Sequence, residues 1–410
     1  MARVFPFQAY RYTAKAGDPA NLVTQPYDKI YPAMRERYLA ASPYNLVRIV
    51  LGETRDSDSG ADNVYTRAAG YLDAWIGQGV LAQDSAPGMF AYFQDFEIPG
   101  TSERLTRKGL VALGALEEYA NGVVFRHEQT LSGPKKDRME LLRHTRAHLE
   151  QLFLMYQDEE GAVDRILDGA AAGAPELSVT DEYGAHHSLW RIADPAAISR
   201  IQVLMADRKL IIADGHHSYE TALAFAKEHP DIKGADRVVM TLVNMHSPGL
   251  RILATHRVMS GLDGFDLEAF LSRAAGFEVS ALDSLDGLNR AWEEGEGRVI
   301  IGVASGAKLY KLDGGPAAGR LDVSVLHDSL IHGALGVTPE AVREQKNIRY
   351  VRGLDAACQE VRSGAAQIAF LLKATSLDQV AEVSFGGGVM PQKSTDFYQK
   401  LLSGLTIYKF

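Results

Sequence analysis

The sequence predicts a mixed α/β protein, because segments with helical and strand-like patterns alternate along most of its 410 residues. Residues 209–230 (KLIIADGHHSYETALAFAKEHP) predict a buried strand, a tight turn and a helix. Residues 236–245 (DRVVMTLVNM) are rich in β-branched and apolar residues, which favours a second buried strand. Hydrophobic residues make up 46% and charged residues 23%, the balance of a globular protein with a full core.

The other elements are expected in chain order. Helices are predicted at 32–41, starting at Pro32, at 64–78, ending before Gly79, at 136–151, 160–173 and 195–207. Strands are predicted at 46–52, 89–98, 104–116, 152–158 and 186–194, the last with both His186 and His187 at the surface. A loop is expected around Ser132-Gly133-Pro134, and helix and strand patterns alternate again towards residue 410.

A change of composition near residues 258–265 indicates a domain boundary. We expect an N-terminal α/β region (1–120), a central domain with a phosphate-binding loop (121–260) and a C-terminal α/β domain (261–410).

The composition excludes several classes of protein. With 43 Lys and Arg against 52 Asp and Glu, the net charge is −9, which argues against nucleic acid as a partner. The single cysteine, Cys358, rules out an intrachain disulfide and a thiolate zinc site, and its helical surroundings predict a small buried side chain. Neither a signal peptide nor an apolar run of about 18 residues is evident, so we expect a cytoplasmic protein without a membrane partner. No organic cofactor is indicated, and the oligomeric state, homo-oligomers included, is left open.

The turn Asp214-Gly215-His216-His217 is the strongest functional signal. Gly215 permits the positive φ that a tight turn from strand to helix often needs. The first helical turn, expected to continue into a helix from near Tyr219 with Ser218 as its cap, presents N–H groups and the positive end of the helix dipole to an anion. The two histidines add donors or charge, and Asp214 would orient a histidine, take a proton or bind a metal. The alternative is that Asp214 and Ser218 only cap the helix and the histidines fill polar space.

Four other blocks contain candidate site residues. Glu128 is a candidate general base beside His127, and Lys135 with the backbone of Ser132 and Gly133 would contact a phosphate. Lys393, after three glycines, is a further phosphate contact, although the spacing is not that of a P-loop. His256 and Arg257, and Asp28 and Asn45 in turns, are candidate substrate contacts. The alternatives are solvated charges, surface pairs and turn capping. A zinc site formed by His127, His216 and His256 is a further alternative.

At the central turn, IADGHHSYETAL (212–223) resembles the DGHHR-type loop of the ParB/sulfiredoxin-like superfamily, which binds nucleotide or phosphate there and includes kinases of free serine. The whole chain resembles the family called domain of unknown function 1015. The blocks that carry this resemblance are QPYDKI (25–30), SPYNLVRI (42–49), HEQTLSGPKKDR (127–138), residues 212–223, LVNMHSPGLRILATHR (242–257) and MPQKSTDFYQKLLSG (390–404). The resemblance implies a ParB/sulfiredoxin-like central domain and phosphorylation of free serine, with pyrophosphate among the donors.

The chain departs from the family pattern at two positions. Ser218 stands where the loop usually has arginine, and Gln129 where lysine is common. Each change removes a cation whose charge-assisted hydrogen bond to phosphate is worth about 1.5–3 kcal/mol. The leading hypothesis is phosphoryl transfer from a nucleotide or pyrophosphate to a small hydroxyl-bearing metabolite such as serine. Mg²⁺ would bind both the phosphates of the donor and Asp214. His216 and His217 would hold the phosphates, and Glu128 would be the base. The alternatives are a hydrolase or a nucleotide- or phosphate-binding regulator.

Overall fold

The computed structural model describes residues 1–128 and 132–410, and these fall into two units. The first unit contains residues 1–126, the described part of 130–251, and 399–410. The second contains residues 127–128 and 252–398. The chain is therefore a mixed α/β protein, as the sequence predicts, in which the last residues return to the first unit. The division into regions 1–120, 121–260 and 261–410 stays a prediction, as does the ParB/sulfiredoxin-like identity of the central part.

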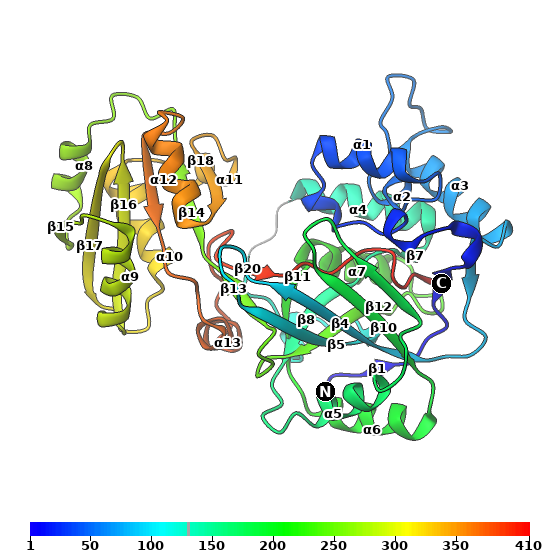
Figure 1. The fold of residues 1–410 in the computed structure, drawn as a ribbon. Coiled ribbons are helices and arrows are strands. Elements are labelled where there is room, and N and C mark those ends of the chain that lie inside the picture. The colour runs from blue at the N-terminus through cyan, green and yellow to red at the C-terminus, as the bar shows by residue number, and fades with distance from the viewer. Residues whose placement is uncertain (129–131) are drawn as a thin grey trace. The chain divides into compact units, whose positions relative to one another are not determined.

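The first unit is built on a nine-stranded mixed sheet (Figure 1). Its strands in spatial order are β6 (Val124–Phe125), β11 (Leu210–Asp214), β8 (Leu152–Tyr156), β12 (Arg237–Asn244), β5 (Arg104–Ala115), β4 (Met89–Glu97), β10 (His186–Ile192) and β9 (Leu177–Thr180), with β1 (Val4–Phe5) also paired to β5. The pairs β11–β6 and β12–β8 are parallel, and the other neighbours among these strands are antiparallel. Two small sheets join β2 (Tyr10–Tyr12) to β3 (Leu81–Gln83) and β7 (Ala147–His148) to β21 (Tyr408–Lys409).

Helices cover one face of this sheet with apolar side chains. Val163, Ile201 and Ala222 belong to three helices that pack on strand residues such as Leu154 and Met240 in one core. These helices are α5 (Ala162–Ala170), α6 (Pro195–Ala206) and α7 (His216–Glu228), and Figure 1 shows α5 and α6 together. A second core of this unit joins α2 (Val47–Val50), α3 (Val64–Gly77) and α4 (Ser132–Thr145). Helix α1 (Pro32–Ala41) and the short turns η1 (Ala14–Ala16), η2 (Pro19–Asn21), η3 (Tyr27–Lys29) and η4 (Tyr119–Asn121) complete the unit.

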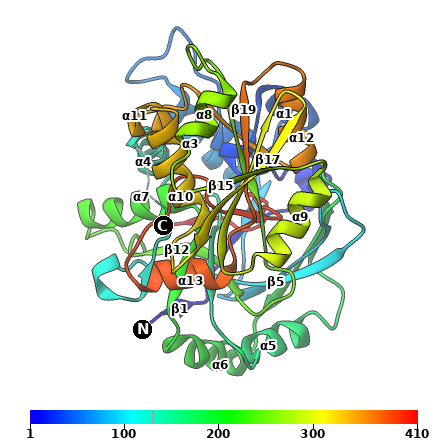
Figure 2. The ribbon, with the colours of Figure 1, turned by 90° about the vertical axis from the view of Figure 1, so that its left-hand side faces the viewer.

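The second unit is built on a six-stranded antiparallel sheet (Figure 2). Its spatial order is β15 (Glu278–Ala281), β17 (Lys308–Pro316), β16 (Arg298–Ser305), β19 (Ile368–Leu371), β14 (Thr255–Met259) and β18 (Ile348–Arg352). Strands β13 (Arg251–Leu253) and β20 (Asp396–Tyr398) form a separate pair.

Helices lie on both faces of the second sheet, as the alternation of its strand residues requires. Helices α9 (Leu285–Glu294) and α12 (Leu354–Arg362) share a core with Ala369 and Leu371, and buried Cys358 of α12 belongs to it as predicted. On the other face, Phe270 of α8 (Leu267–Arg273) contacts Phe370. The remaining helices are α10 (Asp322–Val325), the π-helix η5 (Leu326–Ala334), α11 (Pro339–Arg343) and α13 (Leu377–Phe385).

Three of the predicted elements are wrong. The apolar run 46–52 contains the short helix α2 instead of a strand, because a short buried apolar run has no period that separates the two, and Asn45 Oδ1 accepts the N–H of Val47 at its start. The predicted loop at Ser132-Gly133-Pro134 is the first turn of α4, where proline is tolerated, and α4 ends at Thr145 rather than at 151. Helix α7 begins at His216 instead of near Tyr219, so Ser218 lies inside its first turn and does not cap it.

No helix among the described residues is both long and apolar enough to cross a membrane.

Candidate functional site

Gly215 makes the turn from β11 to α7 possible. Its φ of 94° and ψ of 24° are left-handed, as predicted from the sequence. A Cβ at this position would lie 2.8 Å from Leu152 Cδ2 on the neighbouring strand, so Leu152 would have to shift to admit a side chain, whose backbone would also be strained. The pairing of β11 with β8 shifts register between Ile212 and Asp214, a bulge of the kind that often re-aims a side chain beside a functional site.

A small hollow lies at this turn in the first unit. We call it the Asp214 hollow. Its volume is about 60 Å³, space for a few waters or one small anion and far below the roughly 300–1,000 Å³ of most small-molecule pockets. It is lined by Pro26, Tyr27, Asp28, Glu150, Gln151, Leu152, Phe153, Asp214, Gly215, Ser218, Leu401 and Ser403.

Asp214 is held between the turn and a lysine from the end of the chain. Its Oδ1 accepts the N–H of Gly215 at 2.9 Å, and its Oδ2 accepts a hydrogen bond from Lys400 Nζ, also at 2.9 Å. The Lys400 side chain is only 12% exposed, so this ion pair is screened less than a surface pair. Nearby Arg107 is fully buried, and burial lowers its pKa to about 10, while the charges of Tyr92 and Asp214 act against that shift. Two cations and the positive end of α7 therefore act on one carboxylate.

Glu150 is a second carboxylate of the Asp214 hollow. Its Oε1 accepts hydrogen bonds from the N–H of Tyr27 at 3.0 Å and from Ser403 Oγ at 3.2 Å. Arg138 Nη1 lies 3.6 Å from its Oε2, and the guanidinium stacks 3.9 Å from the Tyr27 ring centroid. Burial raises the pKa of Glu150, and the charge of Arg138 opposes that rise. A carboxyl group with a raised pKa in a cleft is suited to proton transfer.

The other predicted residues of the first unit divide between the Asp214 hollow and places away from it. Asp28 is exposed at the hollow, while His216 is buried and His217 half-buried in the first turn of α7. Lys135 forms an ion pair with Glu220, one turn further along α7. Asn45 is fully buried and does not line the Asp214 hollow.

Asn45 is a structural residue. Its Oδ1 accepts the N–H of Val47, and its Nδ2 donates to the carbonyl of Asn21 at 2.8 Å. Both ends of its amide are therefore used within the fold, which is consistent with the capping alternative. Its role as a substrate contact stays a prediction. Ser132 and Gly133 lie in the first turn of α4, and Gln129 lies outside the described residues.

The second unit brings the remaining predicted residues together. His127 Nε2 lies 2.8 Å from Thr395 Oγ1, and the His127 carbonyl accepts the N–H of Met390. Glu128 Oε1 accepts the N–H of Lys393 at 3.4 Å, and Lys393 has a left-handed φ of 56°.

Arg257 and His256 are buried next to this group. Arg257 Nη2 donates to the carbonyl of Lys393 at 2.9 Å, and burial lowers the Arg257 pKa to about 10 against the charges of Tyr350 and Glu128. His256 Nδ1 accepts the N–H of Leu372, and burial, aided by the charge of Arg257, lowers its pKa to about 4. His256 is therefore neutral near pH 7 and does not act as a cation there.

Within the described residues, no group of three or more His, Cys, Asp or Glu side chains is placed to hold a metal ion by itself. A Mg²⁺ ion would suit Asp214 only with phosphate oxygens and waters as its other ligands, which is how Mg²⁺ commonly binds with nucleotides.

Sequence reasoning missed two residues at the Asp214 hollow, Lys400 and Glu150. Lys400 falls inside the singled-out block 390–404, so the block was a usable signal. Its partner Asp214 lies 186 positions away, and no local pattern indicates that pairing. His187, predicted at the surface, is fully buried on a sheet face that carries other polar side chains, while His186 is exposed as predicted.

Comparison with solved structures gives distant likenesses. A conserved hypothetical protein from Pyrococcus furiosus is 15% identical, with a TM-score of 0.36, over 69% of this chain and 92% of that one. A free serine kinase in complex with AMP is 16% identical, with a TM-score of 0.38, over 69% and 88%. C-terminally truncated SbnI from Staphylococcus aureus is 10% identical, with a TM-score of 0.38, over 72% and 85%. No curated protein matches the chain in sequence.

The family model described as "Protein of unknown function (DUF1015)" matches residues 4–330, well over half of the 410 residues. This match confirms the family resemblance, and it covers the sequence blocks up to residue 257 but not the block 390–404. The chain belongs to the DUF1015 family.

Proposed function

We propose that this protein transfers a phosphoryl group from a nucleotide or pyrophosphate to the hydroxyl of a small metabolite, free serine or a related amino acid. The observation that carries the proposal is the left-handed Gly215 turn at the start of α7, with Asp214 paired to Lys400 at the same point. A helix N-terminus, a largely buried lysine and a glycine that admits close backbone approach are together suited to a phosphate. The DGHH loop resemblance supports the same chemistry.

The Asp214–Lys400 pair gives this site a way to accept a charged donor. Without ligand, the two side chains neutralise each other at 2.9 Å. A Mg²⁺-bound phosphate carries both signs of charge, so its metal would suit Asp214 and its oxygens would suit Lys400 and the first N–H groups of α7. Lys400 would then stabilise negative charge on the transferring phosphoryl group.

The acceptor needs a base for its hydroxyl proton and a partner for its ammonium group. Asp28 is exposed at the Asp214 hollow and is our candidate for the ammonium. Glu128 is the base predicted from the sequence, whereas Glu150 lines the hollow and has a pKa raised by burial. A Glu128→Gln variant without activity beside an active Glu150→Gln variant would assign the base to Glu128. The reverse result would assign it to Glu150.

A phosphate-binding regulator without turnover is the second candidate function. It is favoured by Ser218, which lines the Asp214 hollow where family members usually carry arginine, and by the hollow's volume of about 60 Å³. Without this cation, binding of the transition state for phosphoryl transfer would be weakened more than binding of the phosphate in the ground state, because charge builds up in the transition state.

Incubation with serine and Mg²⁺ plus ATP, ADP or pyrophosphate tests the proposal. Phosphoserine detected by mass spectrometry with any one donor supports the kinase. We expect Asp214→Asn and His216→Ala to abolish it, and Asp231→Asn, an exposed aspartate of the same unit, to leave it unchanged. Tight donor binding by calorimetry without product from any donor would favour the regulator. Release of inorganic phosphate without phosphoserine would favour a hydrolase.

A further inference from the structure

Polar side chains form a band across the face of the first sheet, on the three neighbouring strands β10, β4 and β5. His187 of β10 and Arg107 of β5 are both the register partners of Gln94 on β4. Register partners point to the same face of a sheet, so the three side chains lie in a row. Tyr92 is two residues from Gln94 on β4 and shares this face. All four are buried.

This polar band holds the main chain of residues 399–403, which we call the Lys400 segment. Gln94 Nε2 donates to the carbonyl of Lys400 at 2.8 Å. Arg107 Nη2 donates to the carbonyl of Gln399, and its Nε donates to Gln94 Oε1 at 3.0 Å. The N–H of Leu402 donates to the Tyr92 hydroxyl at 3.3 Å. The backbone of Lys400 and of the residue before it is therefore tied to the sheet.

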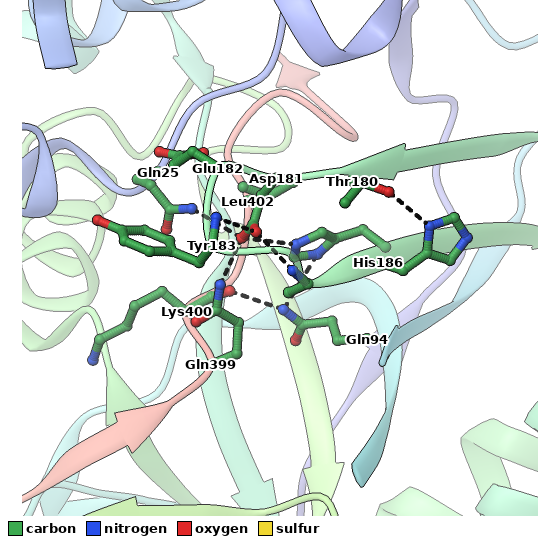
Figure 3. Close-up of polar contacts among 12 residues, drawn as sticks. Gln25, Gln94, Thr180, Asp181, Glu182, Tyr183, His186, Gln399, Lys400 and Leu402 are labelled. Atoms are coloured by element: carbon green, nitrogen blue, oxygen red, sulfur yellow. Dashed lines mark hydrogen bonds and ion pairs between the residues drawn. The ribbon is translucent and has the colours of Figure 1, made fainter. Parts of the chain in front are cut away.

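Asp181 is the centre of the network that holds the Gln399 side chain (Figure 3). Its Oδ2 accepts hydrogen bonds from Gln399 Nε2 at 2.6 Å, Gln25 Nε2 at 3.1 Å and His187 Nε2 at 3.2 Å. Its Oδ1 accepts the N–H groups of Tyr183 and Ala185, both at 2.9 Å. A buried carboxylate with five donors from four parts of the chain specifies one geometry for all of them.

The protonation states in this network follow from its bonds. His187 Nε2 donates to Asp181, so Nδ1 is the acceptor for the Tyr92 hydroxyl at 2.7 Å. Burial lowers the pKa of His187, although the hydrogen bond and the charge of Asp181 act in the opposite direction. Because the pKa is lowered overall, the ring is neutral near pH 7. Burial alone would raise the pKa of Asp181, but the hydrogen bonds from His187 and from two backbone N–H groups lower it overall. Asp181 is therefore the single negative charge in the network's centre.

We propose that Asp181 and Gln399 are positioning residues, which fix Lys400 at the Asp214 turn. The ammonium group of Lys400 is then already ordered before a phosphate binds. A free lysine side chain loses much rotamer entropy when it binds an anion. Here the Lys400 main chain is already fixed, and its Nζ is held by Asp214 at 2.9 Å. Such preorganisation lowers the entropic cost of anion binding. The inference rests on the proposed function for its role, but the placement of Lys400 is testable without any ligand.

The first experiment measures the reactivity of the Lys400 amine. Trace labelling of the full chain with acetic anhydride, followed by peptide mass spectrometry, gives the acetylation rate of each lysine. We expect Gln399→Met, which keeps the buried volume but loses the bond to Asp181, to acetylate Lys400 several-fold faster than the wild type. Asp181→Asn should do the same, so the test does not depend on one variant folding. An unchanged Lys400 rate in both folded variants would overturn the placement.

Gln367→Met is the matched control for this substitution. Gln367 lies in the second unit and makes two hydrogen bonds of similar length, accepting the Leu262 N–H at 2.7 Å and donating to the Leu262 carbonyl at 2.8 Å. Its loss should leave the acetylation rate of Lys400 unchanged. A faster rate in this variant as well would mean that general loosening of the fold, and not the Asp181 network, controls Lys400, and would overturn the inference.

The second experiment is a double-mutant cycle on pyrophosphate binding, measured by calorimetry with Mg²⁺. Lys400→Ala should weaken binding about ten- to a hundredfold, and Gln399→Met about three- to tenfold. In the Lys400→Ala background, Gln399→Met should add nothing, because it acts through the missing ammonium group. Equal weakening in both backgrounds would overturn the positioning role. If the wild type binds no pyrophosphate while the labelling result holds, the proposed function fails and the placement of Lys400 stands.

Discussion

At the scale of single residues, Gly215 is a position where both backbone and space require glycine. Its left-handed φ costs another residue about 1–2 kcal/mol, and a Cβ would also clash with Leu152. We expect Gly215→Ala to lower the free energy of unfolding by about 2 kcal/mol or more in urea titrations. Gly184→Ala is the control, because Gly184 has a φ of 79° with nothing within 4 Å of its Cβ. An equal loss of unfolding free energy in the two variants would show that the Leu152 side chain moves aside at no energetic cost.

His148 makes the stability of the first unit depend on pH. Burial lowers its pKa to about 4, against the effect of a backbone hydrogen bond to Arg237, and it packs on Tyr408 and Phe410. The native state binds fewer protons than the unfolded state between about pH 6.5 and pH 4, so stability is lost as pH falls through that window.

We therefore expect His148→Phe to flatten the pH dependence of unfolding. Below about pH 6.5 the slope should fall by up to about 1.4 kcal/mol per pH unit, which urea titrations from pH 7 to pH 4 would measure. Exposed His186→Phe is the control. The same slope in the wild type and the His148 variant would contradict the assignment.

The residue scale also shows what sequence can and cannot predict at the site. The positive φ of Gly215 followed from its place between a strand and a helix, a local requirement. Lys400 was not recognised, because its partner Asp214 lies 186 positions away. The burial of His187 was not recognised, because residues 399–403, which are distant in sequence, pack on its face of the sheet. A lysine near the chain end and a histidine in a strand have the same local patterns whether they are buried or solvated.

At the scale of elements, the segments with an amphipathic pattern or with a clear start or end signal in the sequence were predicted well. Helix α1 runs from Pro32 to Ala41 as expected, since proline marks its first turn. Helix α2 was mistaken for a strand because a buried run of four residues has no amphipathic face. The start of α7 was placed too late, because its N-cap is Gly215, without a capping side chain to mark it.

Helix α7 lends itself to a charge test at Ser218. This residue lies in the first turn of the helix and lines the Asp214 hollow. We expect Ser218→Arg to strengthen Mg²⁺–pyrophosphate binding about tenfold to a hundredfold, because a charge-assisted hydrogen bond to phosphate is gained. Calorimetry at low and high salt would measure it, with the effect shrinking at high salt. Ser218→Met, which adds length without charge, is the control, and an equal gain there would contradict the electrostatic cause.

At the scale of the whole molecule, the sequence indicated a boundary near residues 258–265, and the second unit takes up the chain at residue 252. The return of residues 399–410 to the first unit was not predicted. Periodicity and turn signals describe neighbours along the chain, whereas this return is fixed by burial of Leu402 and Ile407 and by the polar network on Asp181.

Removal of residues 399–410 should therefore damage the first unit selectively. Their loss uncovers the sheet face that carries buried Arg107, Gln94 and His187. We expect hydrogen exchange measured by mass spectrometry to show lost protection in β4, β5 and β10, with β16 and β19 of the second unit still protected. Lys400→Ala, which keeps the apolar residues of this segment, should retain protection throughout. Protection lost equally in both units would contradict their independence.

Because the ribosome makes the chain from residue 1 onwards, the position of the Lys400 segment in the sequence determines when the first unit can finish folding. The Gly215 turn is synthesised long before Lys400, and residues 252–398 of the second unit are made between them. Domains usually begin to fold as they emerge, but here the first unit cannot close its polar sheet face until translation has passed residue 400. A prematurely terminated product would carry the Gly215 turn without Lys400, and its polar sheet face would be left uncovered. Such an exposed face is what chaperones and proteases act on.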